Sequence, residues 1–304
     1  MTPRLLITGA TGFLGVSGVH HARAVGVEVH AVAREGRSFA SSTAFAHSLD
    51  LFDTERVRVK LAKIQPTHLL HLAWIATPGV YWTSPDNERW RIASRMLLST
   101  FAELGGHRVV IAGTCAEYDW TGNGVCQEYQ TPTQPTTPYG AAKNSLRVWA
   151  EDFGHSQCLS LAWPRLFFLY GPREHPARLV PSVTNALLAG QPAECTAGTQ
   201  DRDFLHVDDA AAALVQLVLS DVTGPVNIGS GEAVSVKTVV ETIADIVGRP
   251  DLLRLGAKPM PPNDPPLLVA DVGRLRNEVK WAPRIGLRRG LEDTVAWWRE
   301  RNAG

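Results

Sequence analysis

The chain has 304 residues, and its 30 basic and 30 acidic side chains leave a formal net charge of zero. This balance argues against nucleic acid and anionic membrane as partners, and no apolar run approaches the roughly 18 residues of a membrane span. The cysteines Cys115, Cys126, Cys158 and Cys195 form no CxxC pair and the N-terminus shows no secretory signal. We therefore expect a cytoplasmic protein without a metal site.

The chain opens with a strand pattern that runs into a glycine-rich turn. Residues Leu5–Ile7 suit a buried parallel strand, and Gly9, Gly12 and Gly15 follow at three-residue spacing. Gly9 allows a tight turn, Gly12 admits a pyrophosphate close to the backbone, and Gly15 lets the next helix pack on the sheet. That helix, which runs to Ala24, points its N-terminal amides at the phosphates. The pattern predicts a dinucleotide cradle made of Gly9, Thr11, Gly12, Phe13, Leu14 and Gly15.

The end of the second predicted strand, Val27–Arg34, indicates which dinucleotide binds. Many NAD-binding cradles place an acidic residue here for the ribose hydroxyls, whereas an arginine accommodates the 2′-phosphate of NADP. This chain has Ala33, followed by Arg34 and Arg37. We therefore predict NADP(H), with NAD(H) possible. The alternative is that the two arginines are only solvated loop residues.

Strand and helix patterns alternate through the first half, which predicts a parallel sheet of right-handed βαβ units. Strands are expected at His47–Leu51 and Thr67–Trp74, and both would reach the cofactor. The aromatic loop of residues 75–89 would either line a substrate cleft or pack on its own lobe. The cofactor residues predicted at these strand ends are Asp50, Leu51, Leu72, Ala73 and Trp74.

Three residues later in the chain carry a pattern typical of carbonyl chemistry. Thr114 follows the predicted strand His107–Ala112, and Tyr139 and Lys143 open a helix four residues apart, so they share a face. A tyrosine has an ordinary pKa of about 10, and a nearby ammonium together with an oxidised nicotinamide would lower that pKa. Tyr139 would then act as acid toward a carbonyl, or as base in reverse, while Thr114 binds the same oxygen.

These motifs resemble the extended short-chain dehydrogenases/reductases, in their nucleotide-sugar epimerase/dehydratase branch. The resemblance extends over essentially the whole chain, with Thr114, Tyr139 and Lys143 at the positions of the family's catalytic set. The matching segments are TGATGFLG (Thr8–Gly15), HLAW (His71–Trp74), PRLFFLYGP (Pro164–Pro172), RDFLHVDDAA (Arg202–Ala211) and PVNIGSG (Pro225–Gly231).

The resemblance implies a fold and a division of the chain. The expected fold is α/β, a Rossmann-type doubly wound parallel sheet with a smaller C-terminal α/β substrate lobe. The dinucleotide-binding domain would hold residues 1–165 and 204–229, and the substrate lobe residues 166–203 and 230–304. Family members commonly dimerise through the helix before Tyr139 and the helix that contains it. A homodimer is therefore expected, and the apolar residues Met96, Leu97, Leu98 and Leu146 would allow it.

Within the family the chain is most similar to ketoreductases that make CDP-paratose and CDP-abequose. Those enzymes use NADPH to reduce the 4-keto group of a nucleotide-linked deoxyhexose. Dehydratases carry an Asp-Glu pair after the catalytic hydroxyl residue, where this chain has Cys115 and Ala116, and epimerases usually carry an acid at the position of Ala33. Reduction is therefore predicted. The alternatives are an NAD-dependent nucleotide-sugar epimerase and an inactive module that senses cofactor or binds a partner.

The resemblance also implies where the nucleotide sugar binds. The arginine of the RDF motif contacts the diphosphate in the family, which gives Arg202 that role here; the alternative is an ion pair with Asp201 or Asp203. Arg178 is a second substrate candidate.

The chain departs from the family at two places near this site. Phe168 stands where an asparagine is common, and Pro261 and Pro262 stand where a later arginine is expected. Asp208 and Asp209 are predicted to cap the helix Ala210–Leu219.

Overall fold

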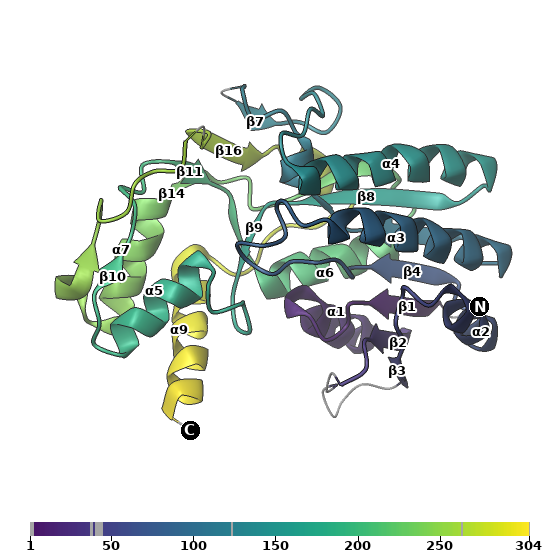
Figure 1. Ribbon diagram of the computed structural model, residues 1–304, viewed down its shortest axis with the longest axis horizontal. Coiled ribbons are helices and arrows are strands. Elements are labelled where there is room, and N and C mark those ends of the chain that lie inside the picture. Colours follow the sequence, from purple (N-terminus) through teal and green to yellow (C-terminus); the bar gives the residue numbers. More distant parts are fainter. Residues whose placement is uncertain (1–2, 37–38, 40–44, 123, 263, 304) are drawn as a thin grey trace.

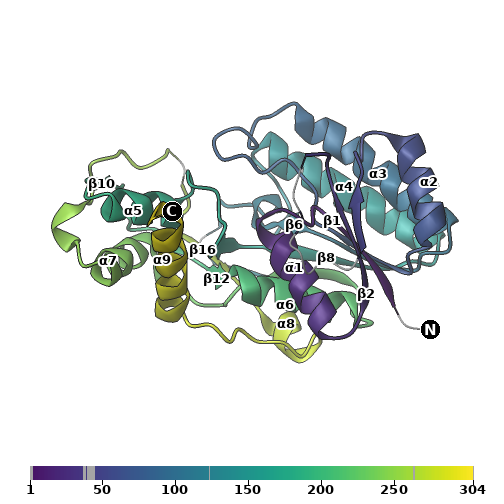
Figure 2. The ribbon, with the colours of Figure 1, turned by 90° about the horizontal axis from the view of Figure 1, so that it is seen from below.

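The computed structural model describes residues 3–36, 39, 45–122, 124–262 and 264–303. It consists of a larger and a smaller lobe that lie side by side (Figure 1 and Figure 2). The predicted cofactor residue Arg37 lies outside the described residues.

The larger lobe is built on a parallel sheet of eight strands. The strand order is β13-β8-β5-β4-β1-β2-β3, and the short β6 pairs with β8. The strand order reverses between β1 and β4, because β2 and β3 follow β1 on one side and β5, β8 and β13 follow β4 on the other. Open parallel sheets bind ligands at such a reversal, so a ligand is expected at the carboxyl ends of β1 and β4. The strands are β1 (Arg4–Thr8), β2 (Glu28–Ala33), β3 (Phe45–Ser48), β4 (His68–His71), β5 (Arg108–Ile111), β6 (Gly113–Thr114), β8 (Ser160–Leu166) and β13 (Gly224–Ile228).

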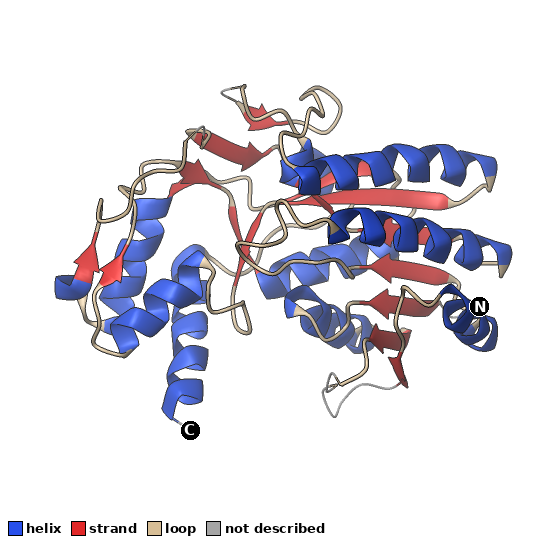
Figure 3. Cartoon of the chain, viewed as in Figure 1, coloured by secondary structure: helices blue, strands red, loops and turns tan. Residues whose placement is uncertain are grey.

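Helices cover both faces of this sheet, as Figure 2 and Figure 3 show. On one face lie α1 (Phe13–Ala24) and α6 (Val207–Val218), which pack on each other. On the other face lie α2 (Thr54–Ile64), α3 (Asp86–Glu103) and α4 (Pro138–Ser156).

The core follows the alternation of side chains along each strand. Leu5 and Ile7 of β1 join the core beneath α1 and α6, whereas Leu6 between them joins the core beneath α2, α3 and α4. All three side chains are completely buried, which is why this strand is an unbroken apolar run.

The smaller lobe packs three helices on short strands. The helices α5 (Leu179–Leu188), α7 (Val236–Val247) and α9 (Leu287–Ala303) share a third apolar core. The remaining elements are β7 (Val125–Cys126), β9 (Phe168–Tyr170), β10 (Ala193–Glu194), β11 (Asp201–Arg202), β12 (Phe204–His206), β14 (Val234–Ser235), β15 (Leu253–Arg254), β16 (Leu267–Ala270), α8 (Gly273–Asn277) and the 3₁₀ turns η1 (Cys115–Glu117) and η2 (Pro250–Leu252). The domain boundaries given above stay a prediction.

The predicted role of Asp208 and Asp209 as caps is wrong. Helix α6 begins at Val207, so both aspartates lie in its first turn, and His206 is the N-cap. The Asp208 carboxylate accepts a hydrogen bond from Ser17 Oγ of α1 at 2.5 Å, and Asp209 accepts from the backbone amides of Arg284 and Ile285. The pair therefore joins α6 to α1 and to the chain before α9.

The predicted dimer face also needs correction. Leu97, Leu98 and Leu146 belong to the core between α3, α4 and the sheet, and each is at most 1 % exposed. Met96 is 45 % exposed, and the apolar residues Ile92 and Val148 on the same two helices are exposed as well. The large apolar side chains that the described residues of α3 and α4 expose are therefore Ile92, Met96 and Val148.

Candidate active site

The turn between β1 and α1 requires its glycines. Gly9 has a φ of +69°, and a Cβ added there would lie 2.9 Å from the Ala73 amide nitrogen. A Cβ on Gly15 would overlap the Gly9 carbonyl oxygen. Helix α1 starts after Gly12 with no side-chain cap, so its first amides are available to an anion. The turn fits the pyrophosphate of a dinucleotide.

A continuous cleft of about 860 Å³ runs from this turn into the smaller lobe. Asp50 is not among its lining residues, and its carboxylate accepts a hydrogen bond from the Phe52 amide at 3.0 Å. The other predicted site residues of the described chain all line the cleft: Gly9, Thr11, Gly12, Phe13, Leu14, Gly15, Arg34, Leu51, Leu72, Ala73, Trp74, Thr114, Tyr139, Lys143, Arg178 and Arg202.

Tyr139 and Lys143 project from the first turns of α4, which begins with Pro138 after the N-cap Thr137. The Thr137 hydroxyl accepts from the Gly140 amide at 3.1 Å, which fixes the start of the helix. Thr114 lies at the end of β6, and its hydroxyl oxygen accepts from the Ala116 amide at 3.2 Å. The structure therefore places the three predicted catalytic residues in one cleft.

The pKa of Tyr139 is raised above its ordinary value. The main cause is burial, and the nearby Tyr81 adds to it, while a hydrogen bond with the Thr114 side chain acts in the opposite direction. The lowered pKa predicted above requires the oxidised nicotinamide as well as Lys143, and it stays a prediction for the cofactor-bound enzyme. At neutral pH the phenol of Tyr139 keeps its proton.

Lys143 lines the cleft but is only 4 % exposed. It donates a hydrogen bond to the Ala112 carbonyl oxygen at 2.8 Å and stands 3.8 Å from the centre of the Trp74 ring. Burial lowers the pKa of Lys143 to about 7, with the charge of Glu117 opposing the shift.

Glu117 is a buried residue that our sequence analysis missed. Its side chain is completely buried and accepts hydrogen bonds from the Thr114 amide, from Trp163 Nε1 at 2.9 Å and from Arg165 Nε at 3.0 Å. With Thr114 it forms a capping box, and the spacing Thr114-x-x-Glu117 is the signal that would have revealed it. Glu117 thereby fixes the backbone on which Thr114 stands.

Aromatic residues of the loop after β4 surround Tyr139. The ring of Tyr81 lies 4.9 Å from that of Tyr139 and the ring of Trp82 lies 5.7 Å from it, both nearly perpendicular to it. Both residues line the cleft, which is the first of the two roles considered for this loop.

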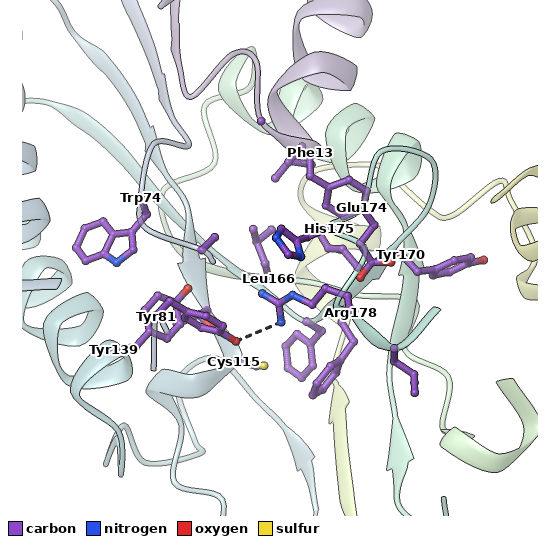
Figure 4. Close-up of a pocket in the computed structure, with 18 of the residues that line it drawn as sticks. Phe13, Trp74, Tyr81, Cys115, Tyr139, Leu166, Tyr170, Glu174, His175 and Arg178 are labelled. Carbon is purple, nitrogen blue, oxygen red and sulfur yellow. Dashed lines mark hydrogen bonds between the residues drawn. The ribbon is translucent and has the colours of Figure 1, made fainter. Parts of the chain in front are cut away.

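The smaller lobe contributes titratable residues to the same cleft. Figure 4 shows Arg178 directed at Tyr81, with Glu174 and His175 near it. Glu174 could not be predicted, because a single glutamate after a YGP motif carries no local signal of burial.

Arg202 forms its ion pair with a residue far along the chain. Its guanidinium lies 2.5 Å from the Asp264 carboxylate and donates to the Pro265 carbonyl oxygen at 2.8 Å. The alternative of an ion pair with Asp201 or Asp203 is wrong, because the Asp203 carboxylate accepts instead from backbone amides that include Gly231 and Ala270.

Phe168, where an asparagine is common in the family, packs under Arg202 with its ring centre 5.5 Å from the guanidinium carbon. Lys258 also lines the cleft, three residues before the proline that replaces the expected arginine.

Two other kinds of site are not found in the described part of the chain. No group of three or more histidine, cysteine or carboxylate side chains is placed to hold a metal ion. No helix there combines the length and the apolar character that crossing a bilayer requires.

The model of the NAD dependent epimerase/dehydratase family matches residues 5–229. The chain belongs to this family. The predicted family and the predicted Rossmann-type fold are thereby confirmed, and the protein is an enzyme of the extended short-chain dehydrogenase/reductase type.

Curated relatives match most of the chain at modest identity. A UDP-glucose 4-epimerase of Mycolicibacterium smegmatis is 27% identical, with 98% of this chain and 99% of the relative covered. A dTDP-6-deoxy-L-talose 4-dehydrogenase (NAD(+)) of Aggregatibacter actinomycetemcomitans is 28% identical, with 78% of this chain and 88% of the relative covered.

Among solved structures, MoeE5 in complex with UDP-glucuronic acid and NAD is 32% identical to this chain. It superposes with a TM-score of 0.84 over 98% of this chain and 99% of its own.

Proposed function

We propose that this enzyme reduces the 4-keto group of a nucleotide-linked 4-keto-6-deoxyhexose with NADPH. The bound dinucleotide supplies the hydride, and the protein's own side chains supply the proton and hold the reacting oxygen. The curated dTDP-6-deoxy-L-talose 4-dehydrogenase supports chemistry at C-4 of a 6-deoxyhexose, since its name describes that reaction in the oxidative direction.

The observation that carries the proposal is that Thr114 and Tyr139 line one cleft, while Cys115 and Ala116 offer no carboxylate of the kind that dehydratases use. At neutral pH the phenol of Tyr139, whose pKa is raised by burial, holds the proton that a carbonyl oxygen needs as it accepts hydride. Thr114 would donate a second hydrogen bond to the same oxygen, because its hydroxyl accepts from the Ala116 amide and can turn its own proton from Tyr139 to the substrate. Lys143 has donors beyond the one given to Ala112 and would hold the nicotinamide ribose.

The cofactor would lie along the glycine-rich turn, with Gly12 and the start of α1 at the pyrophosphate. Arg34 lines the cleft at the end of β2, where its guanidinium would pair with a 2′-phosphate. Ala33 offers no carboxylate to the ribose hydroxyls, and this supports NADPH over NADH.

The nucleotide diphosphate would bind between Arg202 and Lys258. Arg202 already has a carboxylate partner in Asp264, so a diphosphate would share it or displace that partner. The ammonium of Lys258 would supply the second positive charge that the family draws from an arginine at the position of Pro261.

A 4-epimerase with NAD is the second candidate. It is supported by the Mycolicibacterium smegmatis relative, which spans nearly the whole chain, and by the NAD in the MoeE5 complex. An inactive sensing or partner-binding module is a weaker third alternative, because Thr114, Tyr139 and Lys143 all stand in the cleft.

One pair of assays separates these functions. The first follows the loss of reduced-nicotinamide absorbance with NADPH or NADH against dTDP-, CDP- and GDP-linked 4-keto-6-deoxyhexoses. The second incubates UDP-glucose or UDP-glucuronic acid without added cofactor and looks for the 4-epimer by chromatography. Turnover in the first assay with NADPH is the expected result. Turnover only in the second assay would establish the epimerase.

Two further properties are proposed on the same basis. The enzyme would work in the cytoplasm, where its four cysteines stay reduced, and it would form a homodimer through α3 and α4.

A further inference from the structure

Arg178 reaches from the smaller lobe across the cleft to the larger one. It stands at the N-cap position of α5, and its Nη1 donates a hydrogen bond to the Tyr81 hydroxyl at 3.3 Å (Figure 4). Its guanidinium carbon lies 5.0 Å from the centre of the Tyr81 ring. A guanidinium has five N–H donors, and within the described residues Tyr81 is the only hydrogen-bond partner of this side chain. Arg178 therefore has donors to offer to a ligand.

Tyr81 connects Arg178 to the reacting centre. Its ring is 6 % exposed and meets the Tyr139 ring edge to face at 4.9 Å. A sugar oxygen held by Tyr139 and Thr114 would place the neighbouring ring carbons near Tyr81. Substituents on those carbons would then be candidates for contact with the Tyr81 hydroxyl and the guanidinium.

Glu174 lies behind Arg178, in the turn between β9 and α5. It is 8 % exposed, it lines the cleft, and its Oε2 is buried without a hydrogen-bond partner. Burial raises the pKa of Glu174 to about 8, and the charge of Arg178 only partly opposes the shift. At neutral pH the carboxyl group therefore keeps its proton and leaves the charge of Arg178 available to a ligand.

We propose that Arg178, together with Tyr81, binds an oxygen acceptor carried by a carbon next to the reacting carbon of the sugar. The inference rests on the proposed function and adds to it a rule for the substrate. On the proposed 6-deoxyhexose this acceptor is the ring hydroxyl on C-3, because C-5 carries a methyl group. On a hexuronic acid, which fits the second candidate function, a carboxylate attached to C-5 offers the same chemistry. Arg202 does not take this part, because Asp264 and the Pro265 carbonyl hold it at a different place in the cleft.

The test compares the binding of nucleotide sugars with that of the bare nucleotides. Titration calorimetry on the full chain measures UDP, UDP-glucose, UDP-glucuronic acid, dTDP and dTDP-glucose. Arg178→Met should raise the dissociation constants of the nucleotide sugars by about tenfold or more, because it removes a hydrogen bond from a charged group. The bare nucleotides should stay within about twofold of wild type, because they lack the sugar. If Arg178→Met loses equal affinity for UDP-glucose and UDP-glucuronic acid, the group that Arg178 binds is the hydroxyl. If it loses more affinity for UDP-glucuronic acid, that group is the carboxylate.

Matched variants keep the proposal falsifiable if Arg178→Met folds poorly. Arg178→Lys keeps the charge and should retain part of the lost affinity. Glu174→Gln replaces a neutral carboxyl group by a neutral amide and should bind like wild type. Arg289→Met is the control, since Arg289 is exposed on α9 and pairs with Asp293.

Two different results would count against the two proposals. If Arg178→Met binds both bare nucleotides and nucleotide sugars as wild type does, the role of Arg178 is wrong while the proposed function stands. If wild type binds neither class of ligand and turns over nothing, the proposed function itself fails.

Discussion

The ammonium of Lys143 stands 3.8 Å from the centre of the Trp74 indole ring, and its one hydrogen bond within the described residues goes to the Ala112 carbonyl oxygen. A charge held this way is buried at a cost, because the indole face and one carbonyl replace only part of its hydration. The low pKa of Lys143, about 7, expresses that cost.

Replacing Lys143 by methionine should therefore change stability in a pH-dependent way. The pKa of Lys143 is lower in the folded protein than in the unfolded chain, so the lysine charge destabilises the folded protein. This destabilisation is largest below pH 7, where both states are protonated, and it disappears as the pH rises toward 10.5. The free energy of unfolding of Lys143→Met minus that of wild type should be larger at pH 6.5 than at pH 9.5. Urea titrations at both pH values measure it, and a difference that stays constant would contradict the buried charge.

Replacing Tyr139 by phenylalanine should abolish turnover with little effect on cofactor binding. The variant removes the hydroxyl that gives the proton and keeps the ring that packs on Tyr81 and Trp82. We expect kcat to fall by about 100-fold or more, the usual size of a general-acid contribution. Steady-state rates and the dissociation constant for NADPH are the measurements. An unchanged kcat would refute Tyr139 as the proton donor.

The choice of cofactor should depend on Arg34. Changing Arg34 to aspartate places a carboxylate at the end of β2, where it would repel a 2′-phosphate and accept from ribose hydroxyls. The ratio of kcat/KM for NADPH to that for NADH should fall by about tenfold or more, since the exchange removes a charge-assisted hydrogen bond. Arg56→Asp, at an exposed arginine in α2, is the matched control. The same ratio in both variants would exclude Arg34 from the cofactor site.

Glu117 should matter more for stability than for chemistry. Glu117→Gln removes the negative charge beside Arg165 and replaces one accepting oxygen by an NH2 group that faces other donors. We therefore expect a loss of about 3 to 5 kcal/mol in the free energy of unfolding. Glu103→Gln breaks an exposed ion pair with Arg58 and should cost about 1 kcal/mol or less. Urea unfolding of both variants makes the comparison. Equal losses would mean that the buried cluster contributes no more than the surface pair.

The proposed homodimer can be tested at the exposed apolar residues of α3 and α4. Ile92 and Met96 lie one helical turn apart on α3, and they are 50 % and 45 % exposed. Sedimentation velocity of Met96→Glu should show monomers where wild type shows dimers. Leu255→Glu, at a residue of comparable exposure on the other lobe, should leave the dimer intact. A monomeric wild type would rule out the homodimer altogether.

The elements that sequence predicted well are those whose signal is local. The glycines of the first turn and the spacing of Tyr139 and Lys143 report directly on backbone geometry, so their common cleft could be inferred. Glu117 had an equally local signal in its capping box.

The failures concern relationships that only the folded chain defines. Apolar helix residues look alike in sequence whether they face the core or a partner, which is why Leu97 and Leu98 were assigned to the wrong surface. The partner of Arg202 stands 62 residues away and is selected by the pairing of β11 with β16. The burial of Glu174 likewise depends on two lobes coming together.

The indole groups of Trp74, Trp82 and Trp120 all line the cleft beside the catalytic residues. Indole emits light at wavelengths that a dihydronicotinamide absorbs, so a reduced cofactor held in this cleft would accept excitation energy from these side chains. Quenched tryptophan emission, joined by sensitised emission from the nicotinamide, would then report the arrival of the cofactor. The protein carries its own optical probe, without any added label.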